Sequence, residues 1–384
     1  MLKKIKIVHI ITRLDKGGSA ENVLVTCKNL DKEKYDIVLI YGKSQTCKLN
    51  LQFTQYRIDE LVREISPIKD IIAFWKIYKI IKKEKPDIIH THSSKAGFLG
   101  RWSAWLSGSV KKIVHTPHGH VFYGYFSKIK SLFFLFLERI TAKITDKLVA
   151  LTEGEKNESV KFGIGKPQKW IIIHSGVENI NKHYEFKNER LLKELNISKN
   201  SIIIGTVARL EPVKGIKYFI DAIPFILNSE NLQPIVFLIV GDGTERKILE
   251  LKTKKLNIED KVVFTGMRDD VVDLISLMDI YVQPSVNEGM GKTIVMACML
   301  AKPVVATKIQ GIPSIIIDNK TGLLVPAKDS LKLAQAILKL IKDKNLRYQL
   351  GQNAKMFVSE TVEGFPKFSV ERMIYLLEKL YNEL

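Results

Sequence analysis

Residues 201–215 read SIIIGTVARLEPVKG, and this stretch is the clearest sign of the fold class. Its first part, Ser201–Val207, is short, uncharged and rich in isoleucine, as strands buried on both faces of a parallel sheet are. Arg209 and Lys214 follow, five residues apart, before a helical stretch begins. Such a turn can clamp a diphosphate, because Arg binds its oxygens bidentately and Lys acts as a point charge. A solvated turn that happens to hold two cations is the alternative.

Similar apolar runs recur along the whole chain, each followed by a longer amphipathic segment. In the first half they predict strands at Ile5–Ile11, Tyr35–Tyr41, Ile88–Thr91, Lys112–His115, Lys147–Leu151 and Trp170–His174. In the second half they predict strands at Ser201–Val207, Ile235–Val240, Lys261–Phe264, Ile280–Gln283, Pro303–Thr307 and Gly322–Val325. Between the early strands we predict helices at Ala20–Leu30, Asp70–Lys83, Ala96–Leu106 and Ser127–Thr145. The pattern predicts an α/β protein with two doubly wound parallel sheets and ligands at the carboxyl ends of the strands.

The length of 384 residues suits two domains. We place the first domain at residues 1–180 and a polar linker without strand character at 181–200. The second domain is expected at 201–364. The tail, 365–384, has apolar residues at helical spacing, and we expect it to form a helix that packs back on the first domain.

Several features of the whole sequence indicate in which cellular compartment the protein is found. Apolar residues make up 46% of the chain, yet no uncharged apolar stretch approaches the ~18 residues that a membrane-spanning helix needs. The N-terminus runs directly into a strand-like segment rather than a signal peptide. The three cysteines, Cys27, Cys47 and Cys298, are far apart and lack metal-site spacing, which suits a reducing compartment. These features predict a cytoplasmic protein.

The basic charge is concentrated in the first half of the chain. The net charge is +19, and residues 1–180 carry 31 Lys and Arg against 17 Asp and Glu. Such a surplus can face nucleic acid, an anionic membrane or a phosphorylated acceptor, or it can reflect a lysine-rich proteome. No basic block with interleaved aromatics, zinc-ligand spacing or helix-turn-helix pattern is present, so we expect no nucleic-acid partner.

A glycine pair follows the first predicted strand, in residues 12–21, TRLDKGGSAE. Gly17 and Gly18 let backbone N–H groups approach a phosphate at the start of a helix. An ordinary strand-to-helix turn is the alternative. The GxGxxG pattern is absent, which argues against a dehydrogenase.

A third polar segment, residues 284–294, reads PSVNEGMGKTI and follows another buried strand. The Glu288 carboxylate can accept hydrogen bonds from sugar hydroxyls, and the amides at the start of the next helix can bind phosphate. The Gly-Lys-Thr at 291–293 is similar to part of a Walker A loop, but the upstream glycine is missing, which argues against an ATPase.

Together these segments resemble the retaining family 4 glycosyltransferases of the bacterial cell-surface polysaccharide type, which have the two-domain GT-B fold with an interdomain cleft. The similarity extends to Phe264–Asp270, Gly311–Ser314 and Asn319–Val325. It implies that Arg209 and Lys214 grip the donor diphosphate and that Glu288 and His118 contact the transferred sugar. The donor-binding set that it implies is Gly17, Gly18, Gly205, Met267, Arg268, Gly289, Met290, Gly291, Lys292, Thr293, Ile294 and Met296.

One position departs from the family pattern. Family members have a second glutamate eight residues after the first, which binds the ribose hydroxyls of the donor. Here that position is Met296. A lost hydrogen bond of this kind costs about 0.5–1.5 kcal/mol, so donor binding is expected to be weaker but not abolished.

The acceptor is expected on the first domain. His92, Ser93 and Lys95 follow a buried strand and enter a helix, where they can contact a ligand or simply cap the strand end. Tyr123 lies in the segment Val121–Phe134, in which aromatics and lysines alternate. Such a segment suits contact with an anionic membrane surface, although core packing of a helix explains it equally well.

The resemblance implies a retaining transferase that moves a sugar from a nucleotide sugar, with UDP favoured, to an acceptor hydroxyl. No Asp-x-Asp pair is present, since Asp269 and Asp270 are adjacent, so we expect no metal and no other cofactor. The expected acceptor is a lipid-linked glycan used in cell-surface polysaccharide synthesis, reached from the inner face of the membrane. A sugar-nucleotide epimerase of the same fold and a non-catalytic sugar-nucleotide-binding protein remain as alternatives.

Overall fold

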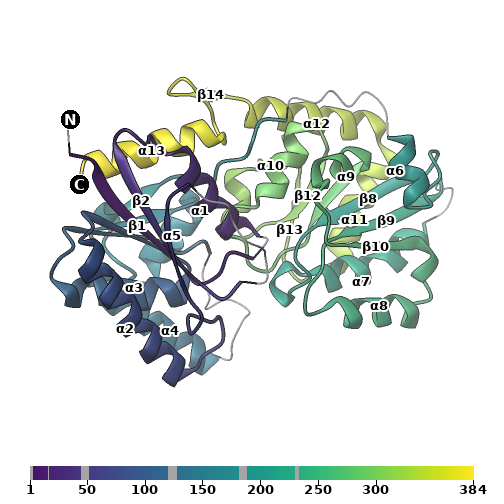
Figure 1. Cartoon of the computed structure of the whole chain (residues 1–384). Coiled ribbons are helices and arrows are strands. Elements are labelled where there is room, and N and C mark those ends of the chain that lie inside the picture. Colours follow the sequence, from purple (N-terminus) through teal and green to yellow (C-terminus); the bar gives the residue numbers. More distant parts are fainter. Residues whose placement is uncertain (1–2, 16, 45–51, 120–127, 181–187, 230–232) are drawn as a thin grey trace. The chain divides into compact units, whose positions relative to one another are not determined.

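The computed structural model describes residues 3–15, 17–44, 52–119, 128–180, 188–229 and 233–384. The chain forms two compact units (Figure 1). Of the described residues, those up to Gly176 form the first unit together with Val370–Leu384, and Val177–Ser369 form the second. Each unit has one large parallel sheet with helices on both faces, which confirms the predicted fold class.

The described part of the first unit has a seven-stranded sheet in the order β3-β2-β1-β4-β5-β6-β7. Its strands are β1 (Ile5–Ile11), β2 (Tyr35–Gly42), β3 (Thr54–Ile58), β4 (Ile88–His92), β5 (Lys112–Thr116), β6 (Lys147–Ala150) and β7 (Trp170–Ile172). Its helices are α1 (Gly18–Asn29), α2 (Pro67–Glu84), α3 (Ser94–Ser107), α4 (Lys128–Thr141), α5 (Glu153–Lys161) and α13 (Val370–Asn382).

Alternate residues of the central strands supply two separate cores, one on each face of this sheet. On one face, Ile7 and Ile11 of β1 pack with α1 and with the C-terminal helix α13. On the other face, Val8 and Ile10 pack with α2 and α3. Helix α13 therefore completes the first unit, as expected from the apolar spacing in the tail (Figure 1).

The residues described in the second unit form a six-stranded sheet in the order β10-β9-β8-β11-β12-β13. Its strands are β8 (Ile202–Val207), β9 (Ile235–Val240), β10 (Val262–Gly266), β11 (Ile280–Gln283), β12 (Val304–Thr307) and β13 (Leu323–Val325), and β14 (Thr361–Val362) pairs separately with β15 (Phe365–Pro366). The helices are α6 (Glu189–Glu194), α7 (Ile216–Leu227), α8 (Arg246–Lys255), α9 (Val271–Leu277), α10 (Lys292–Met299), α11 (Ser330–Lys342) and α12 (Lys344–Val358).

The structure differs from the sequence-based expectation in three places. Strand β3 was not predicted, because it lies at the edge of its sheet and is mostly polar. Residues 188–200, which we assigned to a linker, contain helix α6 with Leu191 and Leu192 buried, and they belong to the second unit. The returning helix begins at Val370 rather than at residue 365.

Both sheets reverse their strand order beside the first strand of the unit. In the first unit the reversal lies between β1 and β4, and in the second between β8 and β11. Loops leaving the carboxyl ends of such neighbouring strands diverge, and the crevice between them is where doubly wound sheets bind ligands. Among the described residues, no helix combines the length and the apolar character needed to cross a bilayer.

Candidate active site

In the second unit, the loops that follow β8 and β11 are tied together at the point of reversal. The backbone N–H groups of Val286 and Asn287 both donate to the Val213 carbonyl oxygen, over 2.8 and 3.2 Å. Gly215 has a positive φ of 65°, and a Cβ there would lie 2.1 Å from the Pro284 carbonyl oxygen. Only glycine therefore permits this close approach of the two loops.

An ion pair joins the same two loops. The Lys214 Nζ lies 2.7 Å from Glu288 Oε2, and both side chains are largely buried, at 19% and 11% exposure. Ser285 Oγ donates to the same carboxylate oxygen over 3.1 Å. The structure thus brings together two residues that are 74 positions apart and that the sequence analysis had placed in one site.

Polar residues that the sequence analysis missed support Glu288. Gln283 donates to Ser285 over 2.8 Å, and Gln310 accepts the Glu288 backbone N–H over 2.9 Å. Tyr281 hydrogen-bonds to Gln283 and to Thr293, each within 2.9 Å. A signal was present in the sequence, since Gln283 and Ser285 are polar residues at the end of an otherwise apolar strand.

Arg209 lies in the same β8–α7 loop, and its backbone carbonyl accepts the Glu211 N–H. Its side chain is half-buried, and its guanidinium has no hydrogen-bond or ion-pair partner among the described residues. The loop therefore presents one cation paired with a carboxylate and one without such a partner.

The entry to helix α10 holds most of the remaining predicted donor-binding residues. Gly291, with φ of 89°, is the N-terminal cap, and its carbonyl accepts the Ile294 N–H. Thr293 is held by Tyr281, Ile294 is fully buried, and Met290 is 2% exposed. Gly289 and Lys292 are half-buried.

The predicted residues at the ribose and base positions vary in exposure. Met296 is half-buried on α10, and Met267 is 49% exposed after β10. Arg268 pairs with Asp270 over 2.6 Å and with Glu194 of α6 over 2.5 Å. The hydrogen bonds with these carboxylates raise the pKa of the Arg268 guanidinium.

Gly205 lies within β8, two residues before its end, and is fully buried. A Cβ at this position would lie 2.5 Å from Met278 Cε, so the glycine leaves room for the Met278 side chain. Packing within the core accounts for this glycine without a ligand.

In the first unit, Gly17 and Gly18 stand at the start of α1, as expected. Ser93 is hydrogen-bonded to Thr12 over 3.2 Å. Lys95 is ion-paired with Asp70 of α2 over 2.7 Å. Lys95 is thus already engaged with its own domain, and its contact with an acceptor stays a prediction. Tyr123 lies outside the described residues.

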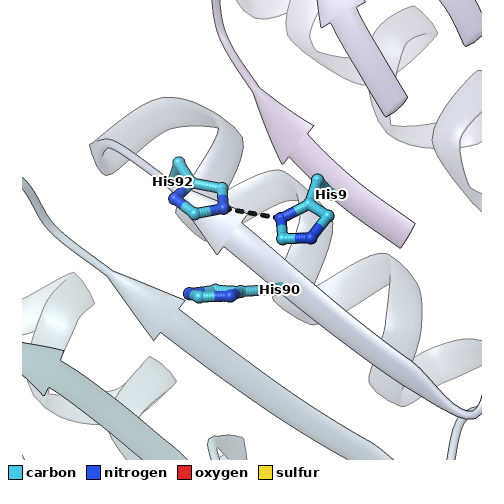
Figure 2. Close-up of side chains that lie close together, drawn as sticks. All are labelled: His9, His90 and His92. Atoms are coloured by element: carbon cyan, nitrogen blue, oxygen red, sulfur yellow. Dashed lines mark hydrogen bonds between the residues drawn. The ribbon is translucent and has the colours of Figure 1, made fainter. Parts of the chain in front are cut away.

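His92, expected to touch an acceptor, is instead buried behind His118. Its Nδ1 lies 3.1 Å from His118 Nε2. Its Nε2 lies 3.0 Å from His9 Nδ1, and this second hydrogen bond is drawn in Figure 2. His118 itself is half-buried at the end of β5, with a left-handed φ of 56°. His92 cannot reach a ligand directly, because it is 1% exposed and both ring nitrogens are used.

Burial favours the neutral form of His9, His90 and His92. Desolvation lowers the pKa of His9 to about 3 and the pKa of His90 and His92 well below their usual value. The nitrogens of these three residues lie within 4.8 Å of one another, a spacing compatible with a metal site. Both nitrogens of His90 are, however, hydrogen-bonded to hydroxyls, to Tyr381 over 2.6 Å and to Thr116 over 2.8 Å.

Glu155 holds the backbone next to His118. It lies at the start of α5, 1% exposed, and accepts the Gly119 N–H over 2.8 Å and the Leu151 N–H over 2.6 Å. Burial raises the pKa of this carboxyl to about 7. No local sequence pattern marks Glu155, because only the folded structure brings its carboxylate to the Gly119 N–H next to His118.

Two family comparisons cover most of the chain. Residues 16–179 match the family described as "Glycosyltransferase Family 4", and residues 187–357 match "Glycosyl transferases group 1". The two matches correspond closely to the two compact units.

Individual relatives match over nearly the full length. The chain is 31% identical to UDP-Gal:alpha-D-GlcNAc-diphosphoundecaprenol alpha-1,3-galactosyltransferase of Escherichia coli, over 99% of this chain and 97% of that protein. It is 26% identical to the capsular polysaccharide biosynthesis glycosyltransferase CapM of Staphylococcus aureus, over 99% and 98% of the two chains. Among solved structures, Anabaena HepE in complex with UDP and glucose shares the fold, with a TM-score of 0.81 at 20% identity over 99% and 100% of the two chains.

Proposed function

The chain belongs to family 4 of the GT-B glycosyltransferases, and on that premise we propose that it transfers a sugar from a UDP-sugar to a hydroxyl of a lipid-linked glycan. We propose further that the transfer retains the anomeric configuration and needs no metal ion. The observation that carries the proposal is the pair of joined loops at the β8–β11 reversal, where Lys214 meets Glu288 and where the β8–α7 loop also holds Arg209.

These loops suit a leaving diphosphate. Breaking the bond between the anomeric carbon and the phosphate oxygen leaves negative charge on the nucleotide and positive charge on the sugar. Arg209 and Lys214 supply fixed positive charge, and the amide end of α10 adds the partial positive charge of a helix N-terminus. Since Lys214 already binds Glu288, a donor would enter a site where the lysine is oriented in advance.

Glu288 is suited to hold the transferred sugar. Its carboxylate is fixed by Lys214 and Ser285, and its backbone N–H by Gln310. A carboxylate held in this way accepts hydrogen bonds from sugar hydroxyls. In line with the family resemblance, we propose that His118 of the first unit also contacts the transferred sugar. Attack of the acceptor hydroxyl from the leaving-group face lets the departing phosphate oxygen take its proton, so no protein base is required.

The relatives favour the donor and acceptor classes. The Escherichia coli relative is named for UDP-galactose and a diphosphoundecaprenol-linked acceptor, and the Anabaena neighbour was solved with UDP. The Staphylococcus aureus relative is named for capsular polysaccharide synthesis. We propose the same classes here, a UDP-sugar and a polyprenyl-diphosphate-linked glycan.

Two exposed apolar stripes support contact with a membrane surface. On α2 the stripe is Ile68, Ile71, Ile72 and Trp75, and on α4 it is Ile129, Leu132, Phe133 and Phe136, each side chain at least 40% exposed. Both stripes have the spacing i, i+3, i+4, i+7, which marks one face of a helix. Such faces normally pack against a core, whereas these face solvent.

Exposed positive charges lie next to these stripes and favour an anionic partner. Lys69 on α2 and Lys128 and Lys130 on α4 are exposed beside the apolar residues, as is Arg63 before α2. Helix α3 contacts both α2 and α4 (Figure 1). Apolar side chains flanked by lysines fit an anionic lipid surface, where the acceptor's lipid would be anchored. Only Leu135 and Thr141 of α4 are buried, and this exposure supports the membrane contact that we propose.

A donor screen followed by a transfer assay tests the proposed function. Thermal unfolding is measured with UDP-, GDP- and other nucleotide sugars, and we expect stabilisation by a UDP-sugar. The stabilising donor is then incubated with polyprenyl-diphosphate-linked N-acetylglucosamine. A product that forms only with the acceptor supports transfer. Conversion of the donor alone would indicate an epimerase, and binding without any product would indicate a non-catalytic protein.

A further inference from the structure

A chain of three imidazoles runs from the sheet core of the first unit to His118, which follows strand β5 of the same sheet. It starts at His9 in the middle of β1, passes through His92 at the end of β4 and reaches His118 after β5 (Figure 2 shows the first step). The two hydrogen bonds are 3.0 and 3.1 Å long. The residues converge because β1 and β4 are neighbours in register, with His9 opposite His90 and Ile11 opposite His92.

The middle ring of this chain has one proton to share between two neighbours. His92 is neutral because burial lowers its pKa well below the usual value. A neutral imidazole donates from one nitrogen and accepts at the other. His92 therefore donates to one neighbour and accepts from the other, and the direction of one hydrogen bond fixes the direction of the second.

The buried ring at the end of this imidazole chain, His9, decides in which direction the hydrogen bonds run. His9 Nε2 is buried and has no hydrogen-bond partner among the described residues. If His118 donates toward the core, the proton of neutral His9 sits on this Nε2 as an orphaned buried N–H, which costs about 1–3 kcal/mol. If His9 donates outward from Nδ1, Nε2 is only a bare lone pair, and unsatisfied acceptors are tolerated better than unsatisfied donors.

We propose that His9 and His92 are positioning residues that fix the tautomer and orientation of His118. In this arrangement His9 Nδ1–H donates to His92, and His92 Nδ1–H donates to His118 Nε2. The ring of His118 then has its own proton on Nδ1, where it can serve as a hydrogen-bond donor. The proposal rests on the proposed function in one respect only, namely that His118 meets the transferred sugar.

Two further features restrain the three imidazole rings. The His90 ring lies 4.2 Å from that of His92 and is anchored to Tyr381 of the C-terminal helix α13. The backbone of His118 is in the left-handed region, which costs free energy for any residue but glycine and persists only where surrounding contacts enforce it. The hydrogen bond from Gly119 to Glu155 is one such contact.

Nitrogen-15 NMR of the full-length protein with labelled histidine tests the tautomers directly, because a protonated and a bare ring nitrogen have different shifts. The chain has only eight histidines, so single substitutions assign the signals. We expect Nδ1 protonation of His9, His92 and His118. A proton on His118 Nε2 would overturn the proposal. This readout needs no turnover, so it separates failure of the proposal from failure of the proposed transferase activity.

A pair of variants tests the positioning role. In His92→Asn the amide can replace Nδ1 and keep the contact with His118, whereas in His92→Gln it can replace only Nε2 and keep the contact with His9. We expect kcat to fall a few-fold in His92→Asn and at least tenfold further in His92→Gln, with the His118 signals changed in the latter. His115→Gln is the control. His115 is equally buried, but it is hydrogen-bonded to Thr91 and is not one of the three linked imidazoles. It should leave kcat and the His118 signals unchanged.

Three results would contradict the positioning role. One is equal kcat in the two His92 variants, and another is an unchanged His118 spectrum in His92→Gln. The third is stoichiometric zinc in the purified protein by elemental analysis, because a metal held by His9, His90 and His92 would occupy nitrogens that the chain needs.

Discussion

At the scale of single residues, the two cations of the β8–α7 loop differ in their surroundings. Lys214 is held by Glu288, whereas Arg209 has no charged partner among the described residues. A donor diphosphate would therefore meet an oriented lysine and an arginine whose guanidinium is available for a bidentate contact. Each is expected to contribute mainly where charge develops on the leaving group.

We predict that Arg209→Ala and Lys214→Ala each lower kcat by about 10²–10³-fold, as the loss of one preorganised donor to a developing anion does. Lys217→Ala is the control, since Lys217 is an exposed lysine on the neighbouring helix α7. Steady-state kinetics with a UDP-sugar measure the effect. Near-normal rates in both site variants would remove these residues from the mechanism.

A substitution at Met296 is expected to strengthen donor binding rather than to weaken activity. Met296→Glu restores the carboxylate that family members have at this half-buried position. A hydrogen bond to a ribose hydroxyl contributes about 0.5–1.5 kcal/mol, so we predict donor binding several-fold tighter. Isothermal titration calorimetry with UDP measures it. Weaker binding would mean that the pocket is shaped around methionine.

Part of this site could be predicted from the sequence, because Arg209, Lys214 and Glu288 stand directly after buried strands. The supporting residues could not. Gln310 is 22 positions from Glu288 and meets it only through the folded loops. The contact of His9 with His92 depends on the register between β1 and β4, which no local pattern reveals.

At the scale of elements, the strands buried on both faces were predictable, since each is a short apolar run between polar turns. Edge strand β3 was not, because only Ile58 of its five residues is buried, so no apolar run marks it. The amphipathic pattern of α4 was visible in the sequence, but the direction in which its apolar face points was not. The structure shows that face exposed.

We predict that this exposure serves membrane contact. Ile68→Glu and Phe133→Glu together should lower binding to vesicles containing anionic lipid at least tenfold, because each places a carboxylate in an apolar stripe beside a negative surface. Sedimentation at low and at physiological salt measures the bound fraction. Phe225→Glu, at a phenylalanine 50% exposed on α7 of the second unit, is the matched control. Equal binding of wild type and the double variant would rule out these stripes as the contact surface.

At the scale of the whole molecule, the buried histidines should make stability depend on pH. The pKa of His9 falls from 6.5 to about 3 on folding. Between these two pH values, the unfolded protein binds a proton at His9 that the folded protein does not. Its stabilising contribution is complete above pH 6.5 and is lost as the pH falls toward 3, at up to about 1.4 kcal/mol per pH unit. Glu155 acts with the opposite sign, because its raised pKa makes its contribution decline as the pH rises from 4.5 to about 7.

Replacing His9 isolates this effect. We predict that the free energy of unfolding of His9→Phe falls less steeply on acidification than that of the wild type, by up to about 1.4 kcal/mol per pH unit. Urea unfolding at pH 7, 6 and 5 measures the two slopes, with Glu155 unchanged in both proteins. Parallel slopes would show that His9 titrates normally in the folded state.

The proposed reaction is metal-independent, retaining transfer from a UDP-sugar to a lipid-linked acceptor. Real-time proton NMR of one reaction, with a UDP-α-sugar, a polyprenyl-diphosphate-linked glycan and excess EDTA, tests it most directly. We expect the first product signal to be an α-linked anomeric proton that grows at the same rate with and without EDTA. A β-linked first product, or a rate abolished by EDTA, would contradict it.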